Sequence, residues 1–182
     1  MKNALLPVFA AVLLTICSGC VLTPRSQQQT AYYDLPVPQA VKQVNFLQIA
    51  AVNNDTPAQS RMLFRKQDNR IVQDYLNCWI QPPERILQRY LTQAFQLQSS
   101  KATDNFLELR CSINAFEFDM AKSEAVLSLK CIFRQGSKKS VEVLSVREKF
   151  TGRNPEDLVK AMTRATEKMT EAIAQKALKI NK

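Results

Sequence analysis

Two stretches of alternating apolar and polar residues constrain the fold of this chain more than any other feature. Their apolar sets are Leu107, Leu109, Cys111 and Ile113 in the first stretch and Leu127, Leu129, Cys131 and Phe133 in the second. A period of two places alternate side chains on one face, so each stretch predicts a half-buried β-strand. A third stretch, residues 141–150, follows a turn that contains Gly136. The three together predict an antiparallel meander.

The hairpin between the first two stretches predicts a pair of facing cysteines. If the chain turns about Ala121, Cys111 and Cys131 are equally far from the turn and face each other across the two strands. They are then close enough for a disulfide, and the alternative is a pair of small apolar core residues. The alternation breaks just before Phe116, where we expect a β-bulge that moves Phe116 and Phe118 to the other face.

The first half of the chain predicts four shorter strands. They are residues 31–35, 41–52, 61–65 and 70–75. Pro36 and Pro38 follow the first and suit a sheet edge, because proline cannot donate a hydrogen bond to a neighbouring strand. The second is rich in β-branched residues and long enough to be buried. Asp68-Asn69 is a plausible hairpin turn between the last two.

Two amphipathic patterns predict helices. Apolar residues recur at helical spacing after Pro82-Pro83 and again after Asn154-Pro155, where Asn154 suits the N-cap position. The first set is Leu87, Tyr90, Leu91, Ala94 and Phe95, and the second is Leu158, Met162, Ala165, Met169 and Ala172 or Ile173. The second helix ends in lysines. It either packs on the sheet with a solvated basic end or lies on a membrane surface.

These elements predict an α/β fold of the α+β-like kind. We expect a curved, mixed or mostly antiparallel sheet with two main helices packed on it, in one domain spanning residues 31–182. The composition agrees, since 46% of the residues are hydrophobic and 23% are charged, as in globular proteins.

The N-terminus reads as a bacterial lipoprotein signal. A short basic start precedes an almost wholly apolar run, residues 4–16, and Ser18-Gly19 supplies small residues before Cys20. We therefore expect residues 1–19 to be removed and Cys20 to carry a diacylglyceryl group and further acyl chains such as palmitate. Residues 20–30 then comprise the lipidated cysteine and a polar tether. The alternative is an uncleaved membrane helix, because about 20 apolar residues can span a bilayer. In either case the domain is exported.

Charge and composition limit the ligands and the reactions that we expect for this protein. The net charge of +9 suits anionic lipid headgroups, an acidic protein partner or a solvated surface, whereas an exported protein does not routinely meet nucleic acid. The chain has no histidine, so histidine-dependent triads and histidine metal sites are excluded. No serine-hydrolase elbow, phosphate loop or zinc pattern occurs. We expect no enzymatic activity, no cofactor and no metal.

The order of short motifs along the chain resembles a known family. After the lipoprotein signal come Tyr32-Tyr33-Asp34-Leu35, Met62-Leu63-Phe64-Arg65, Asn69-Arg70-Ile71, Tyr75-Leu76-Asn77-Cys78-Trp79 and the closing run Glu156-Asp157-Leu158-Val159-Lys160-Ala161-Met162. This series is similar to that of the ABC-type transport auxiliary lipoproteins, the PqiC-like proteins of Gram-negative envelopes. The resemblance implies a mixed α/β sandwich with two helices on a curved sheet.

The resemblance also implies a function. Family members are lipid-anchored at the periplasmic face of the outer membrane. There they accompany an ABC transporter and an MCE-domain protein in intermembrane phospholipid traffic and support envelope integrity. Val21, the second residue of the mature chain, fits transfer to the outer membrane. The alternative is a structural or assembly lipoprotein that binds another outer-membrane protein, and homo-oligomerisation stays open.

Two aromatic residues are candidate contacts for a partner or a lipid. Tyr75 and Trp79 lie together just before the first helix. For Trp79 the alternative is that the indole packs the start of that helix onto the sheet.

Overall fold

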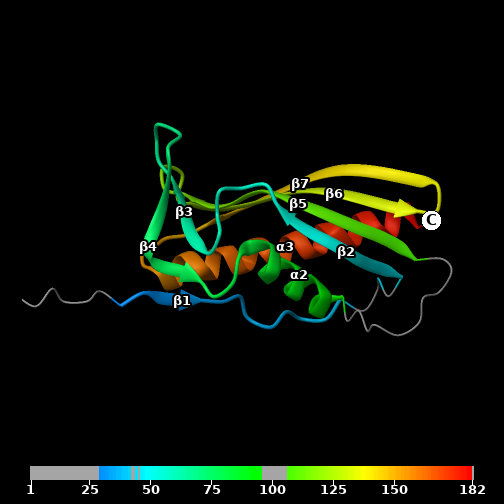
Figure 1. Ribbon diagram of the computed structural model, residues 1–182, viewed down its shortest axis with the longest axis horizontal. Helices are drawn as coiled ribbons and strands as arrows, with labels where there is room; N and C mark the ends of the chain where they lie inside the picture. The colour runs from blue at the N-terminus through cyan, green and yellow to red at the C-terminus, as the bar shows by residue number, and fades with distance from the viewer. Residues whose placement is uncertain (1–28, 42–43, 45, 96–105, 182) are drawn as a thin grey trace, which may run out of the picture.

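An open, mixed seven-stranded sheet forms the centre of the computed structural model, which describes residues 29–41, 44, 46–95 and 106–181 (Figure 1). Its long strands are β5 (Leu107–Asp119), β6 (Glu124–Gln135) and β7 (Lys138–Lys149). β5 pairs antiparallel with β6, and β6 pairs antiparallel with β7. The predicted meander is therefore confirmed.

The remaining strands are arranged around β5. β2 (Leu47–Asn54) runs parallel to the first half of β5, and β3 (Arg61–Arg65) runs parallel to its last two residues. β4 (Ile71–Trp79) pairs antiparallel with β3, and β1 (Ala31–Tyr33) lies parallel to the end of β4. The strand order is β1-β4-β3-β5-β6-β7, with β2 beside β5. Since both orientations occur, the sheet is mixed, as expected.

Two turns agree with their sequences. Asn69, in the β3–β4 hairpin, has a φ of 60°, a left-handed conformation that asparagine tolerates better than most residues. Gly136, between β6 and β7, has a φ of 57°, where a β-carbon would be strained. These residues allow the tight reversals that the two hairpins require.

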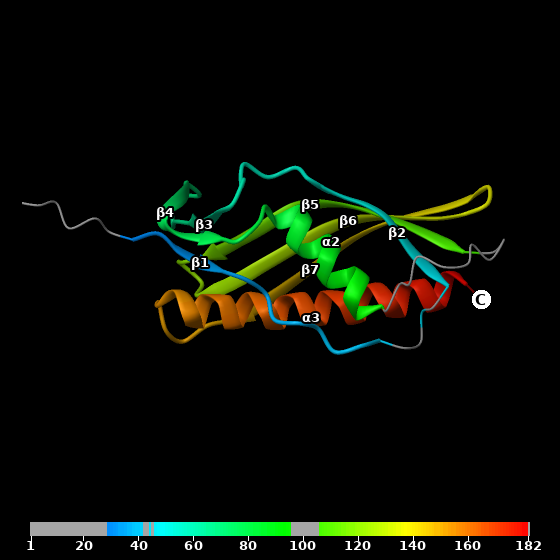
Figure 2. The same ribbon diagram turned by 60° about the horizontal axis from the view of Figure 1, so that its bottom comes forward.

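Both predicted helices are present, and both pack on the same face of the sheet (Figures 1 and 2). α2 (Pro83–Ala94) begins with proline at its first position, and α3 (Pro155–Ile180) begins with a side-chain cap. The Asn154 Oδ1 atom accepts a hydrogen bond from the Asp157 backbone N–H at 2.8 Å. The predicted apolar positions of α3 are buried, so the helix packs on the sheet instead of presenting that stripe to a membrane.

The hydrophobic core lies between this face and the helices, and it includes an aromatic cluster. The Trp79 and Phe116 ring centroids are 5.1 Å apart, and those of Trp79 and Phe118 are 6.3 Å apart. Phe118 is also within 6.3 Å of Phe150. Such ring pairs contribute about 0.5–1.5 kcal/mol each beyond the burial of apolar area.

The structure corrects three details of the prediction. The bulge lies between Ile113 and Ala115, but it keeps Phe116 and Phe118 on the helix-covered face with the other core residues. One extra residue in a strand reverses its parity, so even-numbered positions replace odd-numbered ones in the core. The second strand begins at Leu47 instead of residue 41, and β4 continues past Tyr75 to Trp79.

Some expected segments lie outside the described residues. These are the signal, Cys20 and most of the tether. Within the described part of the chain, no helix is both long enough and apolar enough to cross a membrane.

Candidate functional site

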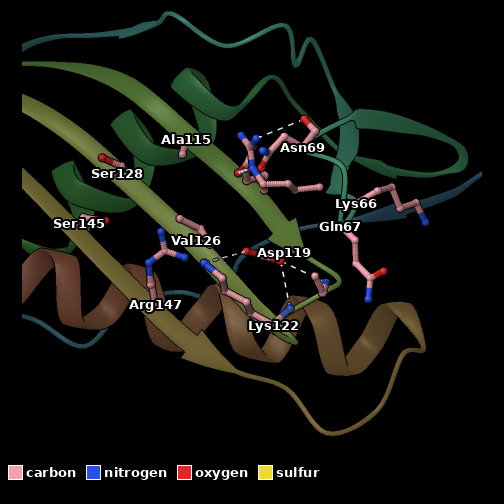
Figure 3. Close-up of a pocket in the computed structure, with 13 residues that line it drawn as sticks. Lys66, Gln67, Asn69, Ala115, Asp119, Lys122, Val126, Ser128, Ser145 and Arg147 are labelled. Atoms are coloured by element: carbon pink, nitrogen blue, oxygen red, sulfur yellow. Dashed lines mark hydrogen bonds and ion pairs between the residues drawn. The ribbon is translucent and has the colours of Figure 1, made fainter.

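The face of the sheet opposite α2 and α3, which we call the open face, carries most of the charged strand residues. Strand alternation puts Arg65, Glu117 and Arg147 on this face, opposite the side that contributes to the core. At the end formed by the β3–β4 and β5–β6 turns the open face contains a hollow of about 420 Å³, shown in Figure 3. Its lining comprises Arg65, Lys66, Gln67, Asn69, Ala115, Glu117, Asp119, Ala121, Lys122, Val126, Ser128, Ser145 and Arg147.

One wall of the hollow is an ion pair between β3 and β5. Arg65 donates to both Glu117 oxygens, with Nε–Oε1 at 2.5 Å and Nη2–Oε2 at 3.0 Å. Glu117 is only 5% exposed. The hydrogen bonds with Glu117 raise the pKa of Arg65, although burial opposes this. The bidentate geometry satisfies a carboxylate that would otherwise be costly to bury.

Asp119 is satisfied mainly by backbone donors. Its Oδ1 atom accepts hydrogen bonds from the Ala121 and Lys122 N–H groups, both at 3.1 Å, which stabilises the β5–β6 turn. The Lys122 ammonium lies 4.0 Å from Asp119 Oδ2, too far for a hydrogen bond. Lys122 therefore keeps its donors available to the hollow.

The opposite wall is Arg147 on β7. Its Nη1 atom is 3.3 Å from Glu124 Oε2, and Lys149 Nζ is 3.1 Å from the other oxygen of the same carboxylate. The hydrogen bond with Lys149, reinforced by Arg147, lowers the pKa of Glu124 below its usual value. Because Arg147 uses one nitrogen in this pair, the rest of its guanidinium can face the hollow.

Tyr75, a predicted contact residue, is 69% exposed at an irregular part of β4. Leu63 pairs with Gln73 and Arg61 pairs with Cys78, so β4 has extra residues between these positions. Asp74 holds the resulting bulge by accepting from the Leu76 and Asn77 backbone N–H groups at 2.8 and 3.1 Å. The ring of Tyr75 lies 4.2 Å from the Arg61 guanidinium carbon. The bulge thus presents an exposed aromatic ring on a well-supported backbone.

Trp79, the second predicted contact residue, lies in the core. Its side chain is 1% exposed and contacts Phe116 and Phe118. It lies at the end of β4, immediately before α2, as in the alternative in which the indole packs the start of the helix onto the sheet. Of the two predicted contact residues, Trp79 is therefore buried and Tyr75 is exposed. Only Tyr75 of this pair is accessible to a partner.

Cys111 and Cys131 are direct cross-strand partners, as their positions predicted. Both are buried thiols with their Sγ atoms 3.4 Å apart, and Cys78 is a third buried thiol. The hydrogen bond to Cys131, together with burial, raises the pKa of Cys111, and burial raises that of Cys78. Both thiols are thus held in the unreactive neutral form. A disulfide between Cys111 and Cys131 stays a prediction.

The described residues include no group of three or more Cys, Asp or Glu side chains placed to hold a metal ion. Sequence reasoning named Tyr75 as a candidate contact, which stays a prediction, and missed the hollow, whose walls come from four strands. Arg65 and Glu117 are 52 positions apart, and only the parallel β3–β5 pairing brings them together. The one available signal in the sequence was the set of polar positions on the alternating strands. These positions identify a polar face, but they do not show which strands lie side by side.

A comparison with protein families matches residues 36–174 to the ABC-type transport auxiliary lipoprotein component. The match covers well over half of the chain, so this protein belongs to the ABC-type transport auxiliary lipoprotein family. The family is described as an auxiliary component of transport, which agrees with a non-enzymatic role. The resemblance inferred from the short motifs is confirmed. No curated protein matches the sequence.

Two solved structures share the fold. One, an uncharacterised protein, is 16% identical with a TM-score of 0.69, and the match covers 81% of this chain and 98% of the other. The second is protein XCC0632 from Xanthomonas campestris, 18% identical with a TM-score of 0.68, covering 81% of this chain and 95% of the other. At these identities the similarity establishes the fold alone.

Proposed function

We propose that this protein is a lipid-anchored periplasmic subunit, without catalytic activity, of an ABC transport system that moves phospholipids between membranes. Its partner in this proposal is the MCE-domain protein of that system, and Cys20 carries the lipid that holds it at the periplasmic face of the outer membrane. The observation that carries the proposal is the family match over residues 36–174. The lipoprotein signal and the contribution to envelope integrity belong to the same proposal.

The architecture supports a docking role. One face of the sheet is covered by α2 and α3, while the open face is polar, and Tyr75 is exposed on a supported bulge of β4. An exposed tyrosine beside a cation is typical of protein interfaces and of the interfacial layer of a membrane. Tyr75 is therefore our candidate contact for the partner or for lipid.

Crosslinking in intact cells, followed by purification of the full chain, tests the partner. We expect an MCE-domain protein to be recovered. We expect Tyr75→Ala to reduce its yield several-fold, because surface aromatics often dominate binding energy. Val141→Ala, which alters an exposed apolar residue on β7, is the matched control. Recovery of an unrelated outer-membrane protein instead would favour the structural or assembly lipoprotein.

The anchor is tested separately with Cys20→Ala. In cells supplied with labelled palmitate, the unaltered chain should incorporate the label and Cys20→Ala should not, because the substitution removes the acylated residue. Absence of label from the unaltered chain would favour the uncleaved membrane helix, and label retained by Cys20→Ala would contradict lipidation at Cys20.

A further inference from the structure

We propose that the hollow of the open face binds a phosphate-type oxyanion. Four cationic side chains line it, namely Arg65, Lys66, Lys122 and Arg147, against two carboxylates, Glu117 and Asp119. This inference deepens the proposed function and rests on it for the source of the anion. The chemistry of the pocket can be tested without any partner protein.

Both carboxylates are already compensated. Glu117 accepts two hydrogen bonds from Arg65, and Asp119 accepts two from backbone N–H groups of the β5–β6 turn. Their charge therefore opposes an incoming anion less than two unpaired carboxylates would. The remaining cations, Lys66, Lys122 and Arg147, give the hollow an excess of positive charge.

Several donors in the hollow have unused capacity. Lys66 makes no side-chain ion pair or hydrogen bond within the described residues, and Lys122 lies 4.0 Å from its nearest carboxylate oxygen. Arg147 has one described ion pair, through Nη1. Figure 3 shows the Lys122 and Arg147 side chains, from a turn and a neighbouring strand, extending into the same region. Charged donors converging on one space suit a multivalent oxyanion.

Two hydroxyl groups lie on the floor of the hollow. Ser128 on β6 and Ser145 on β7 are direct cross-strand partners, and both line the cavity. Their side chains have no hydrogen bond within the described part of the chain. Ala115 lies beside Ser128 on β5, so small side chains give the hollow its depth. Hydroxyl donors below and cations at the rim can together surround the oxygens of a phosphate.

A neighbouring hollow extends the positive surface. It has a volume of about 690 Å³ and shares Lys66, Gln67 and Ala121 with the first. It adds Arg70 and Arg153 to the lining, against the carboxylate of Asp68, which is paired with Arg70. An anion that enters either hollow thus meets an extended cationic rim.

The position of the hollow bears on the source of the anion. The β3–β4 and β5–β6 turns lie at the same end of the molecule as β1, where the described chain begins, and the C-terminus lies at the other end (Figures 1 and 2). If the chain is anchored through Cys20, phospholipid headgroups lie within reach of this end. A free phosphate compound offers the same chemistry, so the experiment must separate the two.

Titration of the full chain in an uncharged detergent tests the site. Inorganic phosphate should bind saturably and shift the backbone NMR signals of Ser128 and Ser145. Arg147→Gln should weaken binding about tenfold or more, the loss expected for one charge-assisted hydrogen bond. Ser145→Val should also weaken phosphate binding, because it removes a hydroxyl donor and fills space at the bottom of the hollow. Valine is well tolerated in β-strands, so the fold should be retained.

Arg134→Gln is the matched control, since it removes one positive charge from the open face of β6 outside the hollow. It should leave phosphate binding unchanged. An equal loss in Arg134→Gln, or no saturable binding by the unaltered chain, would overturn the proposal, because either result means that charge alone attracts the ion.

A second titration with soluble dihexanoyl-phosphatidylglycerol identifies the source. Competition with phosphate, abolished by Arg147→Gln, supports a headgroup site, whereas binding of phosphate alone supports a free oxyanion. Equally tight, Arg147-independent binding of dihexanoylglycerol, which lacks the phosphate, would count against a headgroup site. Failure of the partner assignment appears only in the crosslinking experiment, and failure of the anion site appears only here.

Discussion

The two faces of the sheet differ in how they use the same strands. On the covered face, β5 and β6 present leucine, phenylalanine and cysteine to α2 and α3, and these side chains are almost fully buried. On the open face the same strands present charged and small residues, and the carboxylate of Glu117 is buried only together with Arg65. The comparison indicates that packing on the covered face stabilises the fold, whereas side chains on the open face are left accessible for binding.

The largest expected effect sharpens this comparison directly. Trp79→Ala on the covered face should lower the free energy of unfolding by about 4 kcal/mol, because it leaves a cavity beside the rings of Phe116 and Phe118. Val143→Ala on the open face, where the valine is 65% exposed, should cost less than about 1 kcal/mol. Urea unfolding of both variants measures the difference. Similar losses would mean that the open face also contributes to the core.

An intermediate effect tests whether side chains on the open face contribute to the stability of the fold. Arg65→Leu should destabilise the domain by about 2 kcal/mol, because it leaves the Glu117 carboxylate buried without its partner. Replacing both residues, with Arg65→Leu and Glu117→Leu together, should restore most of the loss. If the two substitutions are instead additive in urea unfolding, the pair is not coupled and the wall of the hollow is not held by it.

The smallest expected effect concerns pH and the bulge below Tyr75. Burial acts to raise the pKa of Asp74, but hydrogen bonds from the Asn77 side chain and the Leu76 and Asn77 backbone outweigh it and lower the pKa below 3.8. A lowered folded-state pKa adds stability above the unfolded-state value, and this is lost as pH falls through the folded-state value.

Asp74→Asn should therefore cost about 1 kcal/mol at neutral pH. The cost should shrink as the pH falls from about 4, where the unfolded chain takes up the proton, through the lower folded-state pKa, where the native aspartate is protonated as well. Urea unfolding at both pH values measures this. Asp55→Asn, at an exposed carboxylate without a side-chain hydrogen bond in the described structure, should change stability little at either pH. A constant difference for Asp74→Asn would show that the charge of Asp74 plays no part.

The difference between the faces also explains how far the sequence predicts the structure. Strict alternation identified the meander and the Cys111–Cys131 pairing, because side-chain period and hairpin symmetry are local properties. Helical periodicity and the Asn154 cap identified α2 and α3 for the same reason. The residues of the covered face can thus largely be predicted from the sequence.

The structure of the open face is harder to predict from the sequence, because it depends on contacts between segments that are far apart in the chain. β4 was predicted too short because the extra residues held by Asp74 interrupt its alternation before Trp79. On the covered face the one error was the consequence of the bulge at Ile113–Ala115, because one inserted residue changes which side chains enter the core. The hollow needs β3 beside β5, a parallel pairing that no local pattern specifies.

The short strand β1 has a mechanical consequence. It is the first described strand, it lies at the sheet edge, and its three residues run parallel to β4, with the Ile80 N–H donating to the Tyr33 carbonyl at 2.8 Å. Behind it, Leu35 is buried and Asp34 pairs with Arg89 of α2. A pull along β1 from the N-terminal side shears these contacts together instead of peeling them one by one. A force applied there would thus load the pairing with β4 and the buried contacts of Leu35 at the same time.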